Sequence, residues 1–264
     1  MKIILLFCLL SLGLFSCRET IKDNFPKKAQ LIFEPGFDGL DAFLNYRDKI
    51  EQRKDLRVLP SLFFTHKSGI TIESRAFLNA DDEILKATID RIDTNGKKLS
   101  LTFYFLKEVL SMVCMEEQNL RSSLSIAART EYFVFYNADQ EPIASYTKIG
   151  KGKLKNQPYK SFKLPKEQHQ AIQENLLLLS DMQNQEGSFA LYFQGFDEAF
   201  NKKFVQFGND NFSTNLAYAP QETLIKALEK NPDAYKNEKF TIQHQPIQEA
   251  SGLQYQVLVG IQKR

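Results

Sequence analysis

The first apolar segment of the chain constrains what the chain can fold into more than any other feature. It runs from Ile3 to Phe15 behind a single basic residue, Lys2, and Cys17 follows shortly after it. A transmembrane helix needs about 20 apolar residues, so this segment is too short to span a bilayer. Its layout is that of a secretory signal. We therefore expect an exported protein that folds after Ser16; the alternatives are a buried first helix or a plain signal with an incidental cysteine.

The end of the segment, Leu14-Phe15-Ser16-Cys17, resembles the lipobox of bacterial lipoproteins. The resemblance implies that the Cys17 thiol carries a diacylglycerol, that residues 1–16 are removed and that the new amino terminus is acylated. Each buried CH₂ contributes about 0.8 kcal/mol, and stable anchoring takes two or more chains. In bacterial lipoproteins, Asp directly after the acylated cysteine retains the protein in the inner membrane. Arg18 occupies that position here, so the resemblance implies the outer membrane. No family is recognised for the mature domain.

Cysteine content limits how the exported part is stabilised. Cys8 would leave with the signal and Cys17 would be acylated, so Cys114 alone would remain. No intramolecular disulfide can then form, and the fold depends on its hydrophobic core. The sequence has 22 Phe and 10 Tyr but no Trp, and aromatic residues favour strands. The polar residues 17–28 would form a short tether.

Hydrophobic periodicity predicts both helices and strands. Apolar residues at helical spacing predict about four helices, over 38–50, 107–127, 165–179 and 220–228. Alternating or apolar runs predict strands near 58–65, 70–78, 84–93, 99–105, 131–137, 142–149, 189–193, 203–207, 240–245 and 254–261. Asn95-Gly96 between two of these runs is a strong hairpin signal. Because most strands would pair with sequence neighbours, the expected fold class is α+β, with mainly antiparallel sheet from sequential hairpins and about four packed helices.

The length of the chain suits one large domain or two small ones. We expect α+β units over 29–150 and 161–264, divided at 150–160, and the two could form one continuous fold. The net charge of +2 is small. A net charge this close to zero does not indicate a protein that binds nucleic acid.

Residues that could carry catalysis are present but do not form a motif. His66, His169 and His244 lack metal-ligand spacing, so we assign no metal and no cofactor. Ser145-Tyr-Thr-Lys148 matches the Ser-x-x-Lys pattern of penicillin-binding proteins. Ser145 lies in a strand-like run, however, where side chains three apart face opposite sides. We therefore assign no catalytic residue.

A basic stretch is the best candidate binding site in the sequence. Its lysines are Lys148, Lys151, Lys153, Lys155, Lys160, Lys163 and Lys166. No acidic residue lies among them, and Tyr159 and Phe162 are interleaved. Such a local field attracts anionic headgroups or another polyanion. The alternative is a solvated linker. An exported location makes nucleic acid an unexpected partner.

These observations favour a membrane-tethered lipoprotein of the cell envelope that binds a protein or another envelope component without catalysis. Its partners would be the membrane, through Cys17, and an envelope protein or anionic headgroup. One alternative is an envelope hydrolase whose site is assembled from residues distant in sequence. Another is a protective lipoprotein that neutralises a toxin.

Overall fold

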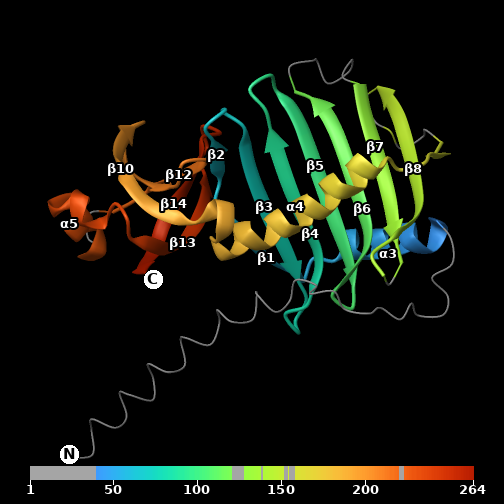
Figure 1. Cartoon of the computed structure of the whole chain (residues 1–264), viewed down its shortest axis with the longest axis horizontal. Helices are drawn as coiled ribbons and strands as arrows, with labels where there is room; N and C mark the ends of the chain where they lie inside the picture. The colour runs from blue at the N-terminus through green and yellow to red at the C-terminus, as the bar shows by residue number, and fades with distance from the viewer. Residues whose placement is uncertain (1–39, 121–127, 138, 152–153, 155–157, 220–222) are drawn as a thin grey trace, which may run out of the picture.

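A computed structural model describes residues 40–120, 128–137, 139–151, 154, 158–219 and 223–264. Of these residues, 52% lie in strands and 22% in helices. The strands join into one 14-stranded sheet. In space the sheet has two parts, a curved open sheet and a small barrel beside it (Figure 1). The expected signal, tether and Cys17 lie outside the described residues.

The first part is an antiparallel sheet whose strands follow one another along the chain. Its strands are β1 (Arg57–Pro60), β3 (Thr71–Leu78), β4 (Ile84–Ile92), β5 (Lys97–Leu106), β6 (Val109–Asn119), β7 (Ala128–Tyr136), β8 (Pro142–Lys151) and β9 (Lys160–Ser161). β1 pairs with β3, and from β3 to β9 each strand pairs with the next. The Asn95-Gly96 turn joins β4 to β5 as predicted, with Gly96 at φ 76°.

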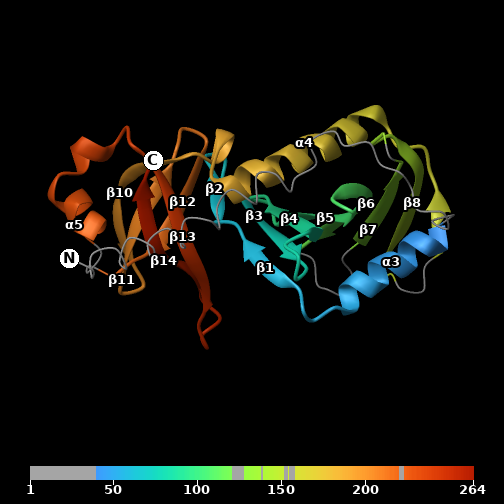
Figure 2. The ribbon, with the colours of Figure 1, turned by 90° about the horizontal axis from the view of Figure 1, so that it is seen from below.

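Two helices cover opposite faces of this sheet, α4 (Lys166–Asn184) and α3 (Leu40–Gln52) (Figure 2). Successive side chains of a strand point to opposite faces. Phe103 of β5 belongs to the core that contains Ile172 and Leu179 of α4. Its neighbour Tyr104 belongs to a second core around Phe43 of α3. The sheet is therefore apolar on both faces, each buried under its own helix.

The prediction of a helix over 107–127 is wrong, because strand β6 lies in this range. Val109–Asn119 of this range pairs as a strand with β5 and β7, and residues 121–127 lie outside the described residues. Lys107 and Glu108 have φ of 51° and 66° and form the tight turn that begins the strand. All residues from Val109 to Val113 are buried, because helices cover both faces of the sheet. Such a strand reads as a continuous apolar run, which periodicity alone does not distinguish from a buried helix.

The second part is a barrel that closes on itself. It contains β10 (Leu191–Ala199), β11 (Lys202–Gly208), β12 (Phe212–Ala217), α5 (Thr223–Lys230), β13 (Lys239–Gln248) and β14 (Gln254–Lys263). Short 3-10 helices, Gly187–Phe189 and Pro232–Tyr235, precede β10 and β13. Pairing runs from β10 through β11, β12, β14 and β13 back to β10. Only the β12–β14 pair is parallel. A five-stranded Greek-key barrel with its helix between the third and fourth strands has the topology of an OB-fold.

β10 reaches two neighbours because it bends in the middle. Leu191 and Tyr192 pair with β13, and the strand from Tyr192 to Ala199 pairs with β11. The register shifts between Phe193 and Gly195. Such a bulge bends a strand and increases its twist. The bend lets a single strand turn the corner that closes a small barrel.

Hydrogen bonds join the barrel to the sheet. β2 (Phe64–His66) pairs with β3 of the sheet and with β12 of the barrel. Gln185, just after α4, donates from Nε2 to the Ile242 carbonyl at 2.6 Å and accepts from the Ile242 N–H at 2.8 Å. Arg264 donates to the Asn184 carbonyl at 2.9 Å and to the Glu186 carboxylate at 2.9 Å. The end of α4 is thus bound to the closing strands of the barrel.

The expected fold class, α+β with about four packed helices, is wrong. The structure is mostly β, its large sheet is mixed, and its described residues contain three α-helices. One expected helix is β6, and β12 was not predicted at all. The division into 29–150 and 161–264 stays a prediction; α4, from the second range, covers the sheet built from the first. Among the described residues, no helix is both long and apolar enough to cross a membrane.

Candidate functional site

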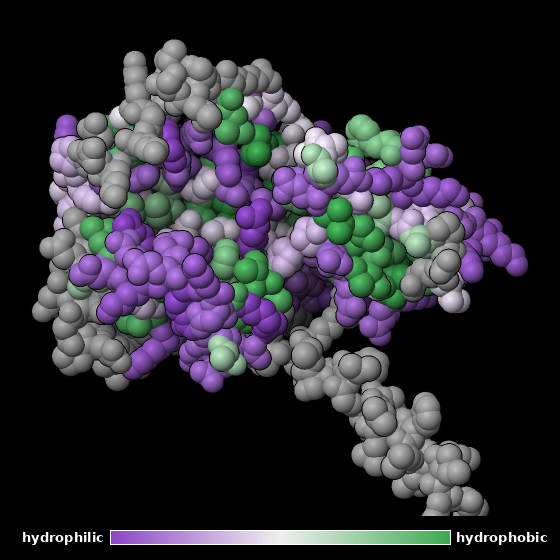
Figure 3. Space-filling model, turned by 180° about the vertical axis from the view of Figure 1, so that it is seen from behind, coloured by the Kyte–Doolittle hydropathy of each residue, from purple (hydrophilic) through white to green (hydrophobic). Residues whose placement is uncertain are grey.

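The surface is hollowed where the barrel meets the sheet, and the hollow has two adjoining parts. The barrel pocket has a volume of about 460 Å³ and includes Thr65, Thr71, Asp197, Phe200, Phe204 and Asn215 in its lining. The junction pocket has a volume of about 290 Å³ and includes Ser61, Glu73, Arg75, Ile247 and Gln248. Both contain Phe63, Gln254, Tyr255 and Gln256. Seen from behind, the molecule shows apolar patches on the barrel (Figure 3).

The barrel pocket lies on the outer face of β11 and β12. Val205 and Phe207 of β11 are 0% exposed and belong to the core, so Phe204, directly before Val205, points outward. Asn215 is likewise exposed next to the buried Leu216. The turns β10–β11 and β13–β14 flank this face. OB-folds bind oligonucleotides and oligosaccharides at the corresponding surface.

Phe200 is the most unusual residue of the barrel pocket. It forms the two-residue turn between β10 and β11 with Asn201, and their φ values are 52° and 58°. Turns of this kind favour Asn and Gly, because a bulky side chain at positive φ is strained. Phe200 is also 74% exposed. A large apolar ring is therefore held in water at a backbone position that costs free energy, which is a feature typical of functional sites.

The polar groups of the barrel pocket are mostly uncharged. Thr65, Thr71, Asn215 and Gln254 supply hydroxyl and amide groups, and Asp197 supplies a carboxylate. None of its described lining residues is Lys or Arg. The nearby Lys202 forms an ion pair with Glu249 at 3.0 Å, and its Nζ lies 5.0 Å from the centre of the Tyr255 ring. Its charge is thus already paired.

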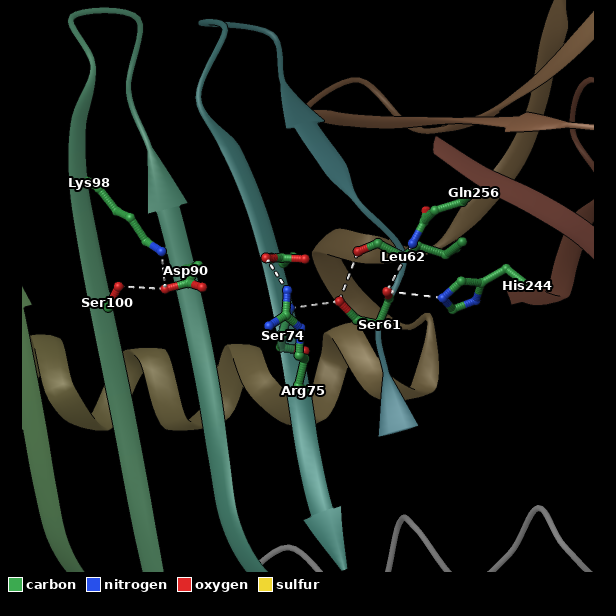
Figure 4. Close-up of polar contacts among 10 residues, drawn as sticks. Ser61, Leu62, Ser74, Arg75, Asp90, Lys98, Ser100, His244 and Gln256 are labelled. Carbon is green, nitrogen blue, oxygen red and sulfur yellow. Dashed lines mark hydrogen bonds and ion pairs between the residues drawn. The ribbon is translucent and has the colours of Figure 1, made fainter. Parts of the chain in front are cut away.

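The junction pocket holds charged groups. Arg75 donates to Glu73 at 2.8 Å. Burial raises the pKa of Glu73, and the nearby Asp90 raises it further. Asp90 accepts a hydrogen bond from Ser100 at 2.5 Å and forms an ion pair with Lys98 at 3.3 Å (Figure 4). The lining of this pocket therefore includes a paired carboxylate and guanidinium.

A hydrogen-bond network binds Ser61, at the junction pocket, to β14 and β13. Gln256 is 2% exposed. Its Oε1 accepts from the Phe63 N–H at 2.8 Å, and its Nε2 donates to the Ser61 carbonyl at 3.2 Å. His244 Nε2 lies 3.1 Å from the same carbonyl (Figure 4). A carbonyl only accepts, so Nε2 carries the proton. Burial lowers the pKa of His244.

This network does not activate a nucleophile. The Ser61 hydroxyl donates to the Leu62 carbonyl at 2.8 Å and accepts from the Ser74 N–H at 2.9 Å. His244 contacts the Ser61 carbonyl rather than the hydroxyl. Nucleophilic catalysis needs a base within hydrogen-bond reach of the hydroxyl. The contacts of Ser61 and His244 are instead those of structural residues.

The structure does not bring together the other residues that we weighed for catalysis. Ser145 lies in β8 and donates to the Phe162 carbonyl at 2.5 Å. His66 lies 2.7 Å from Ser68 at the β2–β3 turn. The His169 ring packs near Tyr136 under the sheet, with centroids 5.8 Å apart. In the described ranges, no group of three or more His, Cys, Asp or Glu could hold a metal.

The lysine stretch divides into residues with different surroundings. Lys148 is 8% exposed. Its Nζ lies 3.7 Å from the centre of the Tyr159 ring. Lys160, Lys163 and Lys166 are exposed. Lys153, Lys155 and the side chain of Lys151 lie outside the described residues. A polyanion site on this stretch stays a prediction.

Cys114 is the one cysteine that the structure describes, and it is free. It lies on β6, within the range 107–127 whose apolar spacing predicts a helix. Burial raises the pKa of its thiol to about 12. A thiol of this kind is protonated at neutral pH and is a poor nucleophile. Cys17, the expected lipid attachment site, lies outside the described part of the chain.

The chain matches no protein-family model, no curated protein and no solved structure. Its class therefore rests on its own geometry: a mostly β protein in which an OB-type barrel is joined to a helix-covered sheet, with a groove at the joint. The barrel pocket was missed in the sequence because its residues come from β2, β3, β10, β11, β12 and β14. The available signal was Phe200-Asn201 between two strand-like runs, where a turn would expose Phe200.

Proposed function

We propose that the chain is an exported, lipid-anchored binding module of the cell envelope, and that its ligand occupies the barrel and junction pockets. The observation that carries the proposal is the strained and exposed Phe200 at the rim of the barrel pocket. An exposed aromatic ring beside convergent polar groups is typical of a binding site. The lipobox resemblance of Leu14 to Cys17 supports the location.

A binding role fits the chemistry of the groove better than catalysis does. Ser61 and His244 have structural contacts. Glu73 is paired with Arg75. Asp197 is the one carboxylate among the described residues of the barrel pocket. No observation favours the hydrolase or the protective lipoprotein over a binding module.

Retention on envelope material tests the proposal. The full-length protein is purified in detergent and mixed with cell envelopes of the source organism. The lipids are first removed from these envelopes, so that the acyl chains of the protein have no bilayer to enter. The protein should sediment with this material. Phe200→Asn should lose most of the retention, and it is a suitable variant because Asn tolerates positive φ.

Leu177→Ala is the matched control. Leu177 is also a large apolar residue and is 71% exposed, but it lies on α4 and not in either pocket. Its retention should equal that of the unmodified protein. If Phe200→Asn is retained as well as the unmodified protein, the groove is not the binding site.

A further inference from the structure

We infer that the barrel pocket binds an uncharged oligosaccharide; this inference rests on the proposed function and names its ligand class. A sugar ring has a face of C–H groups and a rim of hydroxyls that both donate and accept hydrogen bonds. The pocket offers matching surfaces. Phe200, Phe204 and Tyr255 provide aromatic rings, while Asn215 and Gln254 provide amides.

The amides and the carboxylate suit hydroxyl groups in particular. An amide side chain supplies two donors and one acceptor oxygen, and a carboxylate supplies acceptors alone. Asn215 and Gln254 are exposed. Asp197 lies on β10, two residues after the Gly195 bulge and near the turn that carries Phe200. Rings and hydrogen-bonding groups therefore surround the same hollow.

Charge argues against a nucleic acid or another polyanion in this pocket. Affinity for a nucleic-acid backbone comes mainly from Lys and Arg side chains that neutralise its phosphates. The described lining of the barrel pocket holds no cation and one carboxylate. Lys202 beside it is neutralised by Glu249. A polyanion would face a negative charge and no compensating positive charge there.

Strand pairing argues against a peptide that adds to the sheet. Peptides of that kind bind through an unpaired strand edge. The ring is not paired along its whole length, since β10–β13 and β12–β14 share two residue pairs each. At the pocket, however, β12 pairs along one edge with β11. β12 additionally pairs with β2 on the side of the pocket. At the pocket β12 therefore has no free edge long enough for an added strand, and its side chains are the available contacts there.

The shape of the groove indicates a chain of sugars rather than a single ring. The barrel pocket continues into the junction pocket across Phe63, Tyr255, Gln254 and Gln256. Gln256 is fixed by its contacts to Phe63 and Ser61. This fixed amide at the centre of the groove gives the ligand path a rigid floor. A linear oligosaccharide could extend from Phe200 to the Glu73–Arg75 pair.

The absence of Trp from the sequence provides a sensitive test. Phe200→Trp would place a single Trp at the rim of the barrel pocket and keep an aromatic ring there. The full-length variant in detergent is titrated with chitohexaose, cellohexaose and maltohexaose. Oligothymidylate and a heparin hexasaccharide serve as anionic probes. At least one neutral probe should change Trp emission saturably and bind at least about tenfold more tightly than either anion.

Second variants locate the effect within the Phe200→Trp background. Asn215→Ala should weaken binding of the neutral probe by about tenfold, as expected for loss of a hydrogen bond in a desolvated site. Leu177→Ala should leave it unchanged. Tighter binding of an anionic probe, or an equal effect of the two variants, would overturn the inference. If no neutral probe binds while envelope retention still depends on Phe200, the ligand class is wrong and the proposed function stands.

Discussion

Phe63 and Gln256 are 193 residues apart in the chain and are joined by a hydrogen bond of 2.8 Å. The Phe63 N–H is the donor and the Gln256 side-chain oxygen is the acceptor. The other end of the same amide donates to the Ser61 carbonyl. One buried side chain therefore ties the link between β1 and β2 to β14. Phe63 and Gln256 both line the barrel pocket and the junction pocket.

Gln256→Ala should lower the free energy of unfolding by about 2 kcal/mol, because the Phe63 N–H and the Ser61 carbonyl would each lose a buried partner. Chemical denaturation measures the change. Gln254→Ala is the control, since Gln254 is exposed on the same strand and should change stability little. Equal effects of the two variants would contradict the role given to Gln256.

His244 should make the protein less stable in acid. Burial lowers the pKa of His244 in the folded state, while the unfolded value is about 6.5. The neutral form is therefore the one the fold prefers. The contribution of neutral His244 to the free energy of unfolding is complete above about pH 6.5. It is lost as the pH falls through the lower pKa that His244 has in the folded state.

Urea denaturation at pH 7.5 and pH 5 measures this loss. His244→Gln keeps an N–H for the Ser61 carbonyl but does not titrate, so its stability should depend less on pH between these values. His66→Gln, at the β2–β3 turn, controls for a general effect of removing a histidine. A His244→Gln variant as pH-dependent as the unmodified protein would argue against this account.

Cys17→Ala should release the protein from the membrane. Without the thiol, the acylation implied by the lipobox resemblance cannot occur, and stable anchoring depends on the acyl chains. Detergent partitioning of the variant measures the change. Cys114→Ala is the matched control and should partition as the unmodified protein does. A Cys17→Ala variant that partitions like the unmodified protein would show that the lipid anchor does not exist.

Lys148 should differ from the other described lysines of the basic stretch. Lys148→Met removes its contact with the Tyr159 ring and should lower the free energy of unfolding by about 1 kcal/mol. Replacing Lys160, Lys163 and Lys166 together by Gln should leave stability nearly unchanged.

That triple variant, made in the Cys17→Ala protein, should lose binding to anionic vesicles if the stretch binds headgroups. Unchanged vesicle binding would leave the stretch as a solvated surface.

Local signals in the sequence predicted many elements of the fold. The Asn95-Gly96 turn identified the β4–β5 hairpin, and Pro165 marked the start of α4. β6 was assigned wrongly because burial on both faces removes the alternation that marks a strand. The barrel was not predicted, since its closure depends on pairs such as Leu191 with Phe240 and Leu216 with Gln256. Nothing local in a sequence specifies such distant partners.

The groove was hidden for the same reason. Its residues become neighbours only once the barrel closes against β2 and β3. The lysine stretch, by contrast, was conspicuous because its residues are consecutive. The structure gives Lys148 a packing role that composition alone does not reveal. Phe200 could have been found as an exposed turn residue, but its positive φ is visible only in the structure.

Phe200→Asn should separate stability from binding. Asn adopts positive φ more readily than Phe, and the Phe200 ring is largely exposed, so little packing is lost. The free energy of unfolding should rise by roughly 1 kcal/mol, because a residue with a Cβ at positive φ is strained and Asn tolerates that region better than Phe. Thermal or chemical denaturation measures this gain. A clear loss of stability would mean that the ring packs in the fold rather than serving a ligand.

The most direct test of the groove is the retention of Phe200→Asn on lipid-free envelope material, compared with Leu177→Ala and the unmodified protein. The groove account predicts that retention of Phe200→Asn falls by about tenfold or more, although the variant is at least as stable as the unmodified protein. Retention of Leu177→Ala should not change. Equal retention of all three proteins would contradict the account.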